Sequence, residues 1–227
     1  QLGAILAVAV MYFHKLNPFS PSKSARQKQA TWALWIKIVI ACIPAAVLGL
    51  LFDDWMEAHL YNAYVVAATL IIYGVLFIVL ENSSITANPS ITKVGHVSTK
   101  TALFIGLFQL LSLVPGTSRS GSTILGAMVL GCSRGVAAEF SFFLGIPVMF
   151  GASFLKLVKF FVKGNVLTGP QIFYTILGMA IAFGVSVYSI QFLMGYVRRH
   201  DFKFFGYYRI ILGVVVLAYF GITALAA

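Results

Sequence analysis

Long apolar runs separated by short polar segments dominate the chain. Five of them approach or exceed the ~20 residues that a helix needs to cross a hydrocarbon core, namely residues 34–52, 63–80, 140–161, 172–194 and 206–225. A sixth run, residues 2–13, is shorter and reads as the end of an apolar helix, so we expect residues to precede Gln1. The pattern predicts an all-α integral membrane protein, a polytopic helical bundle.

Two further apolar runs, residues 102–114 and 122–132, are too short to cross the membrane as helices. At helical rise they reach roughly 20 Å and 17 Å, against a hydrocarbon core of ~30 Å. The segment PGTSRSG, residues 115–121, lies between them and interrupts regular helix. We therefore predict a re-entrant helical hairpin over residues 102–132, within a single transmembrane domain over residues 1–227. Such irregular backbone is tolerated at membrane depth where protein or a water-filled cavity covers it.

The composition supports the membrane class. Hydrophobic residues make up 60% of the chain and charged residues 10%, against roughly 45–50% and 25% in soluble domains. The formal charge of +10 could suggest a nucleic-acid partner, but the basic residues lie between the apolar runs instead of on one stripe. Cys42 and Cys132 fall inside apolar segments and are interpreted as small buried hydrophobes. The chain shows no spacing typical of a metal site.

The charges of the connecting segments predict the orientation. Residues 14–33 contain four basic side chains and no acid, whereas residues 53–62 contain three acids and no Lys or Arg. By the positive-inside rule the first segment is cytoplasmic, the second lies outside, and the C-terminus ends outside. Three lysines then lie near the outer face on one helical stripe: Lys156, Lys159 and Lys163. We interpret them as snorkelling to the interface, with attraction of anionic headgroups as the alternative.

Candidate chemistry centres on Arg119, the only formal charge between Thr101 and Ser133. An arginine inside a membrane costs about 2.5–3.5 kcal/mol on insertion scales, so it is a functional hypothesis by default. Gly116 and Gly121 let the backbone approach a ligand closely. Hydroxyls come from Ser118, Ser120, Ser122 and Thr123. We expect a helix from about Ser122, whose N-terminus would face the loop, and the combination favours a phosphate or pyrophosphate site.

Two other interpretations of Arg119 stay open at this point. It could pair with Glu139 and hold two helices together, or the loop could line an ion path. Glu139 itself is expected to open the helix that follows, where the helix dipole favours a carboxylate. Gln109 is a candidate amide near the site, although a helix–helix hydrogen bond is the more common use of such a residue.

The residues around Arg119 also carry a resemblance to a known family. Residues 109–123, QLLSLVPGTSRSGST, and 131–142, GCSRGVAAEFSF, resemble the bacterial undecaprenyl-pyrophosphate phosphatase family linked to bacitracin resistance. The opening QLGAILAV is similar to an early segment of that family. Six residues match its PGxSRSxxT signature: Pro115, Gly116, Ser118, Arg119, Ser120 and Thr123. The family's first signature, an acidic E/QxxxE helix running into a PxSSTGH loop, has no counterpart here, and we expect it upstream of Gln1.

The resemblance implies a function, site residues and a location. It implies hydrolysis of undecaprenyl pyrophosphate to the monophosphate and inorganic phosphate at the outer face of the bacterial cytoplasmic membrane, recycling the lipid carrier for peptidoglycan synthesis. For this reaction we predict Arg119, Ser118, Ser120 and Thr123 as catalytic residues. The predicted substrate-binding residues are Gly116, Thr117, Gly121, Gln109 and Glu139.

The resemblance also implies a mechanism, a cofactor and an assembly. Either water or a serine attacks, assisted by a divalent cation, Mg²⁺ or Ca²⁺, for which this chain shows no ligand set. The fold would be built from inverted repeats, and a homodimer is compatible with it. The alternative function is a polyprenyl-phosphate or anion transporter of the same fold without hydrolysis.

Overall fold

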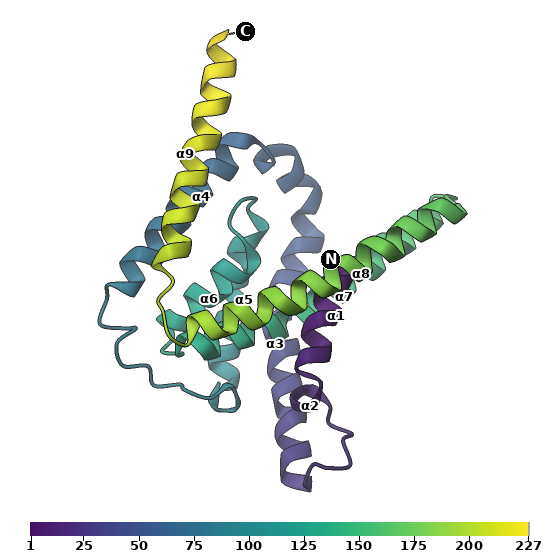
Figure 1. Ribbon diagram of the computed structural model, residues 1–227, viewed down its shortest axis with the longest axis vertical. Coiled ribbons are helices and arrows are strands. Elements are labelled where there is room, and N and C mark those ends of the chain that lie inside the picture. Colours follow the sequence, from purple (N-terminus) through teal and green to yellow (C-terminus); the bar gives the residue numbers. More distant parts are fainter. Residues whose placement is uncertain (227) are drawn as a thin grey trace. The chain divides into compact units, whose positions relative to one another are not determined.

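The computed structural model describes residues 1–226, without the side chains of Asp53 and residues 224–226. Its described elements are helices (Figure 1). They are α1 (Leu2–Met11), α2 (Phe13–Leu16), α3 (Ala25–Leu60), α4 (Ala63–Glu81), η1 (Val94–His96), α5 (Thr99–Leu110), η2 (Leu111–Leu113), α6 (Arg119–Val129), α7 (Arg134–Val162), α8 (Gly169–Val197) and α9 (Lys203–Ala226).

Five helices among the described residues are long and apolar enough to cross a membrane. They cover Ala25–Phe52, Ala63–Glu81, Arg134–Val162, Gly169–Val197 and Lys203–Thr223. Each contains, fully or nearly so, one of the five predicted runs, so the all-α polytopic fold is confirmed. The sixth run forms the shorter helix α1, and the two short runs form α5 with η2 and α6.

Two helices extend further than the hydrophobic pattern predicted. The acidic segment 53–62 was expected to be a loop, but α3 continues through it to Leu60. No Gly or Pro interrupts residues 51–60, and Met56, Glu57 and Ala58 favour helix. The chain turns only at Asn62, whose Oδ1 accepts a hydrogen bond from the Val65 N–H at 2.9 Å and so caps α4. Ala227, predicted to lie outside the cell, is beyond the described residues.

Helix α7 also begins early, at Arg134 instead of Phe140. Ser133 precedes it, and its Oγ accepts from the Val136 N–H at 3.5 Å, which allows the helix to start there. Glu139 was expected to open this helix, but it lies in the second turn. The helix dipole therefore favours its carboxylate less than we predicted.

The chain divides into two compact units, residues 1–39 with 142–196 and residues 40–141 with 197–227. In the first unit, α1 approaches α8 so closely that a Cβ on Gly3 would overlap the Met179 carbonyl. The Tyr12 ring meets Phe143 edge-on at 5.1 Å. Trp35 Nε1 donates to the Leu16 carbonyl at 2.8 Å, which ties α3 to the end of α2.

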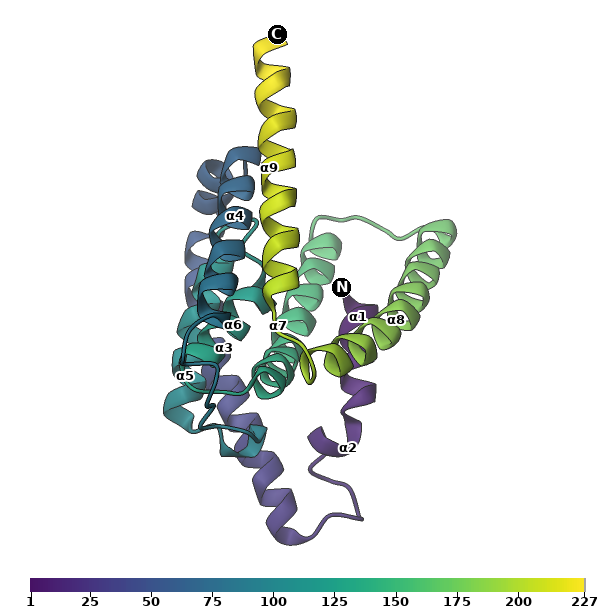
Figure 2. The ribbon, with the colours of Figure 1, turned by 60° about the vertical axis from the view of Figure 1, so that its left-hand side comes forward.

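The second unit holds every predicted site residue. Helices α4 and α9 lie side by side in it (Figures 1 and 2). Glycines allow this approach: a Cβ on Gly74 would lie 2.7 Å from the Gly206 carbonyl oxygen, and one on Gly213 would lie 2.8 Å from that of Ala67. Helices α5 and α6 form a hairpin, with Phe108 packed over Gly126. Re-entry of this hairpin into the membrane stays a prediction.

Candidate functional site

The candidate site is the connection between α5 and α6. After η2 the backbone is extended at Val114, turns left-handed at Gly116 with φ 84°, and takes a positive φ of 69° at Ser118. Helix α6 then begins at Arg119, three residues earlier than predicted. The reason is that Ser118 caps the helix, with its Oγ accepting from the Gly121 N–H at 3.3 Å.

Gly116 is required by both its conformation and its surroundings. A Cβ at this position would overlap Thr69 Oγ1 and lie 2.6 Å from the Val66 carbonyl oxygen, so the loop backbone rests directly on α4. The positive φ at Ser118 is uncommon for a residue other than glycine and costs about 1–3 kcal/mol. Such strain at the start of a helix is typical of functional loops.

Arg119, Ser118 and Ser120 are brought together at this helix start. Arg119 Nη1 donates to the Ser141 carbonyl at 3.3 Å, and the Ser118 and Ser120 hydroxyl oxygens lie 3.3 Å apart. The Arg119 side chain is partly exposed and Ser118 is exposed. A guanidinium has five N–H donors, so Arg119 retains donors for an anion next to two hydroxyls at the start of α6.

Three other predicted residues lie beneath this surface. Thr117, Ser122 and Thr123 are each at most 1% exposed. The Thr123 hydroxyl is 2.7 Å from that of Ser141, and it donates to the Arg119 carbonyl at 3.0 Å. Ser122 Oγ donates to the same carbonyl at 3.0 Å. The Ser122 and Thr123 hydroxyls therefore hold the first turn of α6 in place.

Gln109 is not joined to the loop by its side chain. It is 1% exposed, and neither its amide nitrogen nor its amide oxygen has a hydrogen-bond partner among the described residues. The predicted helix–helix hydrogen bond is therefore not formed there. Gln109 shares a buried face of α5 with Gly106, which contacts Ala41 of α3.

The sequence reasoning missed Arg209 on α9, which contacts the loop directly. Its Nη2 donates to the carbonyls of Gly116 and Thr117, both at 2.7 Å. Its Cζ lies 5.6 Å from the centre of the Tyr73 ring on α4, a cation–π arrangement. Arg209 is a lone charge inside an apolar run, so the rule that selected Arg119 would also have found it.

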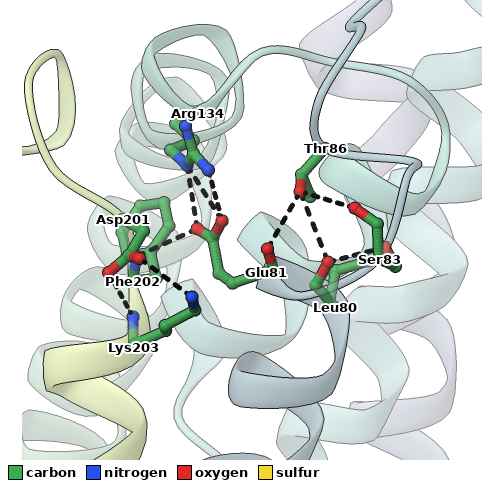
Figure 3. Close-up of polar contacts among 8 residues, drawn as sticks. All are labelled: Leu80, Glu81, Ser83, Thr86, Arg134, Asp201, Phe202 and Lys203. Carbon is green, nitrogen blue, oxygen red and sulfur yellow. Dashed lines mark hydrogen bonds and ion pairs between the residues drawn. The ribbon is translucent and has the colours of Figure 1, made fainter.

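The sequence reasoning also missed a buried ion pair at the end of α4 (Figure 3). Glu81 accepts from Arg134 Nε at 2.9 and 3.0 Å, and its second oxygen also accepts from Arg134 Nη2. Its first oxygen accepts from the Phe202 N–H at 2.9 Å as well. The Glu81 side chain is fully buried. This carboxylate therefore joins the end of α4 to the beginnings of α7 and α9.

Among the residues whose side chains are described, no three His, Cys, Asp or Glu side chains gather where they could hold a metal ion. The loop instead offers hydroxyls, amides and a guanidinium, which are groups that bind anions.

Comparisons with known proteins identify the family and the relatives of this chain. Residues 1–215 match the family described as "Bacitracin resistance protein BacA". The undecaprenyl-diphosphatase of Streptococcus thermophilus is 58% identical over 219 residues, covering 96% of this chain and 76% of the relative. That of Streptococcus mutans is 57% identical over 219 residues, covering 96% and 78%, and that of Enterococcus faecalis is 54% identical over 219 residues, covering 96% and 79%.

Proposed function

Because the chain belongs to the BacA family of bacitracin resistance proteins, we propose that it hydrolyses undecaprenyl pyrophosphate to undecaprenyl phosphate and inorganic phosphate. Curated relatives that share more than half of its residues carry the name undecaprenyl-diphosphatase. The reaction returns the lipid carrier to cell-wall synthesis. The transporter that we considered as an alternative has no support from these relatives.

One observation carries the proposal, namely the position of Arg119 at the start of α6 beside two hydroxyls. A pyrophosphate presents several anionic oxygens, and a guanidinium can hold two of them with parallel hydrogen bonds. The first turn of α6 adds N–H groups and the positive end of the helix dipole. Phosphoryl transfer requires mainly such positioning and charge stabilisation from a protein.

In the proposed reaction, water forms a bond to the terminal phosphorus, or a serine does so and water then hydrolyses the phosphoserine to release inorganic phosphate. The proton of the attacking oxygen passes to solvent. The phosphoanhydride P–O bond breaks, and its electron pair leaves on the oxygen of undecaprenyl phosphate. Arg119 stabilises the charge that develops on the non-bridging oxygens. Ser118 and Ser120 donate to these oxygens, while Gly116 and Gly121, where a Cβ would meet α4 and Arg209, let the loop pack closely against those groups. Thr117 and Thr123 keep the loop and the helix start in place.

The remaining parts of the proposal rest on the family resemblance alone. A divalent cation, Mg²⁺ or Ca²⁺, belongs to the proposal, but we assign no ligand in this chain and no step to it. Glu139 is proposed to lie on the substrate side of the site, whereas Gln109 is buried on the face of α5 that it shares with Gly106. We also propose a homodimer, which light scattering in detergent would test.

We place the protein in the bacterial cytoplasmic membrane with its site open to the outer face. The relatives named above are bacterial, and five apolar helices support multi-pass insertion. The basic segment 14–33 and the acidic segment 53–62 support the orientation.

The experiment is phosphate release from undecaprenyl pyrophosphate by the purified protein, expressed with any segment that its gene encodes before Gln1. We expect one inorganic phosphate per lipid and none from undecaprenyl phosphate. A protein that binds the pyrophosphate lipid without releasing phosphate at any divalent cation concentration would contradict the proposal and favour a carrier.

A further inference from the structure

Arg209 is a second guanidinium in an apolar setting, and it binds the candidate loop from the side of α9. It is the only charged residue between Phe204 and Thr223 of that helix. Placing it in a membrane span costs about as much as placing Arg119 there. Its contacts, however, are different, because both hydrogen bonds of Nη2 go to backbone carbonyls of the loop itself.

These contacts complete a row of bound carbonyls. Thr69 Oγ1 on α4 lies within 2.8 Å of the Pro115 carbonyl oxygen, to which it donates. Arg209 binds the next two carbonyls, those of Gly116 and Thr117. Three successive carbonyl oxygens of the loop are therefore bound by side chains of α4 and α9.

The guanidinium is held in this place from several sides. The Tyr73 ring lies against it, one helical turn after Thr69 on α4. Its Nη1 faces the first turn of α6, since a Cβ built on Gly121 would lie 3.1 Å from it. The close approach of α4 and α9 at Gly74 fixes the helices that carry these side chains.

The direction of the carbonyls matters for an anion site. A carbonyl oxygen carries partial negative charge and repels a phosphate, whereas a backbone N–H attracts it. Carbonyls that are bound by Arg209 and Thr69 cannot turn towards a ligand without losing these hydrogen bonds. The loop is then left to offer its hydroxyls and N–H groups.

We propose that Arg209 is a positioning residue that holds the carbonyls of Gly116 and Thr117 away from the ligand and so fixes the loop in its anion-binding conformation. This inference rests on the function proposed above for the same loop. Arg209 acts through the loop backbone, and Arg119 acts on the pyrophosphate.

The test combines hydrogen–deuterium exchange with kinetics on Arg209→Gln and Arg199→Gln. Arg199 is an exposed arginine between α8 and α9 and serves as the matched control. Exchange is followed in peptides covering residues 115–123, which include N–H groups bonded within the loop, those of Thr117, Gly121 and Ser122. In parallel, kcat and KM are measured for undecaprenyl pyrophosphate.

For Arg209→Gln we expect faster exchange in these peptides without substrate, and a loss in kcat/KM of about tenfold to a hundredfold, the range for losing hydrogen bonds from a charged donor. Arg199→Gln should match the wild type in both measurements. Thr69→Val, which releases the Pro115 carbonyl and removes no charge, should also speed exchange in the loop. If Arg209→Gln does not fold, Tyr73→Leu loosens the same guanidinium and takes its place.

The outcomes separate this inference from the proposed function. Lost activity with wild-type exchange in the loop would mean that Arg209 acts on the substrate itself, and would overturn the inference. Unchanged activity and exchange would overturn it too. If the wild-type protein releases no phosphate, the proposed function fails, and the exchange data alone decide whether Arg209 fixes the loop.

Discussion

Arg119 and Arg209 show how two arginines in apolar surroundings can serve one loop in different ways. Arg119 gives one hydrogen bond, to the Ser141 carbonyl, and keeps donors available next to Ser118. Arg209 uses Nη2 on two loop carbonyls. The loop hydroxyls also differ in their accessibility. Ser118 is exposed, whereas Thr123 is buried and hydrogen-bonded to Ser141.

Arg119→Lys should separate charge from geometry. Lysine keeps the positive charge but lacks the planar fork that holds two phosphate oxygens. We expect a loss of about 10²–10³ in rate, the usual cost of removing a transition-state contact, with little change in thermal stability. The measurement is phosphate release at saturating lipid, with the melting temperature in detergent recorded alongside.

The alternative role for Arg119, an ion pair with Glu139, predicts other results. In that case lysine would replace arginine with little loss, and Glu139→Gln would rescue Arg119→Ala. We expect Arg119→Ala to lose at least as much activity as Arg119→Lys and the double variant to stay inactive. An Arg119→Lys enzyme with more than about half of the wild-type rate would leave only the packing role.

Cys132, in the turn between α6 and α7, should be nearly inert to maleimides. It is 4% exposed, and burial raises the pKa of its thiol from 9.0 to about 11. Because the thiolate is the reactive form, a pKa of about 11 instead of 9.0 lowers the thiolate fraction of Cys132 at pH 8 by about 100-fold. The labelling rate, followed by mass spectrometry, should rise about tenfold per pH unit and approach a plateau near pH 11. Protein unfolded in detergent at pH 8 should label quickly, and equally fast labelling of the folded protein would contradict the burial.

At the scale of elements, the sequence could predict the spans but not their ends or their partners. A span is recognisable because about 20 apolar residues must lie together in the chain. The start of α6 depends on a cap at Ser118 with an unusual φ, and nothing in the hydrophobic pattern reveals it. The pairing of Glu81 with Arg134 and of Arg209 with the loop joins residues far apart in the sequence. Their isolated charges can mark Glu81, Arg134 and Arg209 as candidates in the sequence. Only the packed helices show that Glu81 binds Arg134 and that Arg209 binds the loop.

Glu81→Gln should destabilise the second unit. It removes the charge that binds the Arg134 guanidinium, while Glu81 is fully buried and Arg134 is 34% exposed. Breaking a fully buried pair costs about 3–5 kcal/mol, and the exposure of Arg134 lowers this to about 2–3 kcal/mol because solvent screens its charge. Thermal unfolding in detergent should show a lower melting temperature.

The matched control for Glu81 is the nearby pair of Lys203 and Asp201 (Figure 3). Its charged atoms are 3.5 Å apart and both side chains are about one-third exposed or more. Asp201→Asn should change stability by at most ~1 kcal/mol. If Glu81→Gln and Asp201→Asn lowered the stability equally, the burial of Glu81 would not make its ion pair more stabilising than an exposed one.

At the scale of the whole molecule, orientation is encoded in the segments between the spans. Four Lys and Arg side chains lie before Ala30, in the first turns of α3 or in the segment before it, and three acids follow Phe52 near the end of the same helix. The acids were predicted in a loop and lie in a helix, yet their position beyond the span Ala25–Phe52 is unchanged. The orientation prediction depends on the order of charges and spans along the chain, so it survives this correction.

Cysteines at the two ends of α3 should report opposite sides of the membrane. Ala25→Cys lies in the basic segment and Glu57→Cys in the acidic one, and both positions are exposed. By the positive-inside rule, the excess of Lys and Arg in residues 14–33 predicts that this segment is cytoplasmic. A membrane-impermeant maleimide should therefore label Glu57→Cys in intact cells and Ala25→Cys only after lysis, with the parent protein as the background.

Asn165→Cys, in the α7–α8 turn, should label like Glu57→Cys, which would place Lys156, Lys159 and Lys163 near the outer face. Labelling of Ala25→Cys in intact cells would reverse the orientation and turn the candidate site towards the cytoplasm.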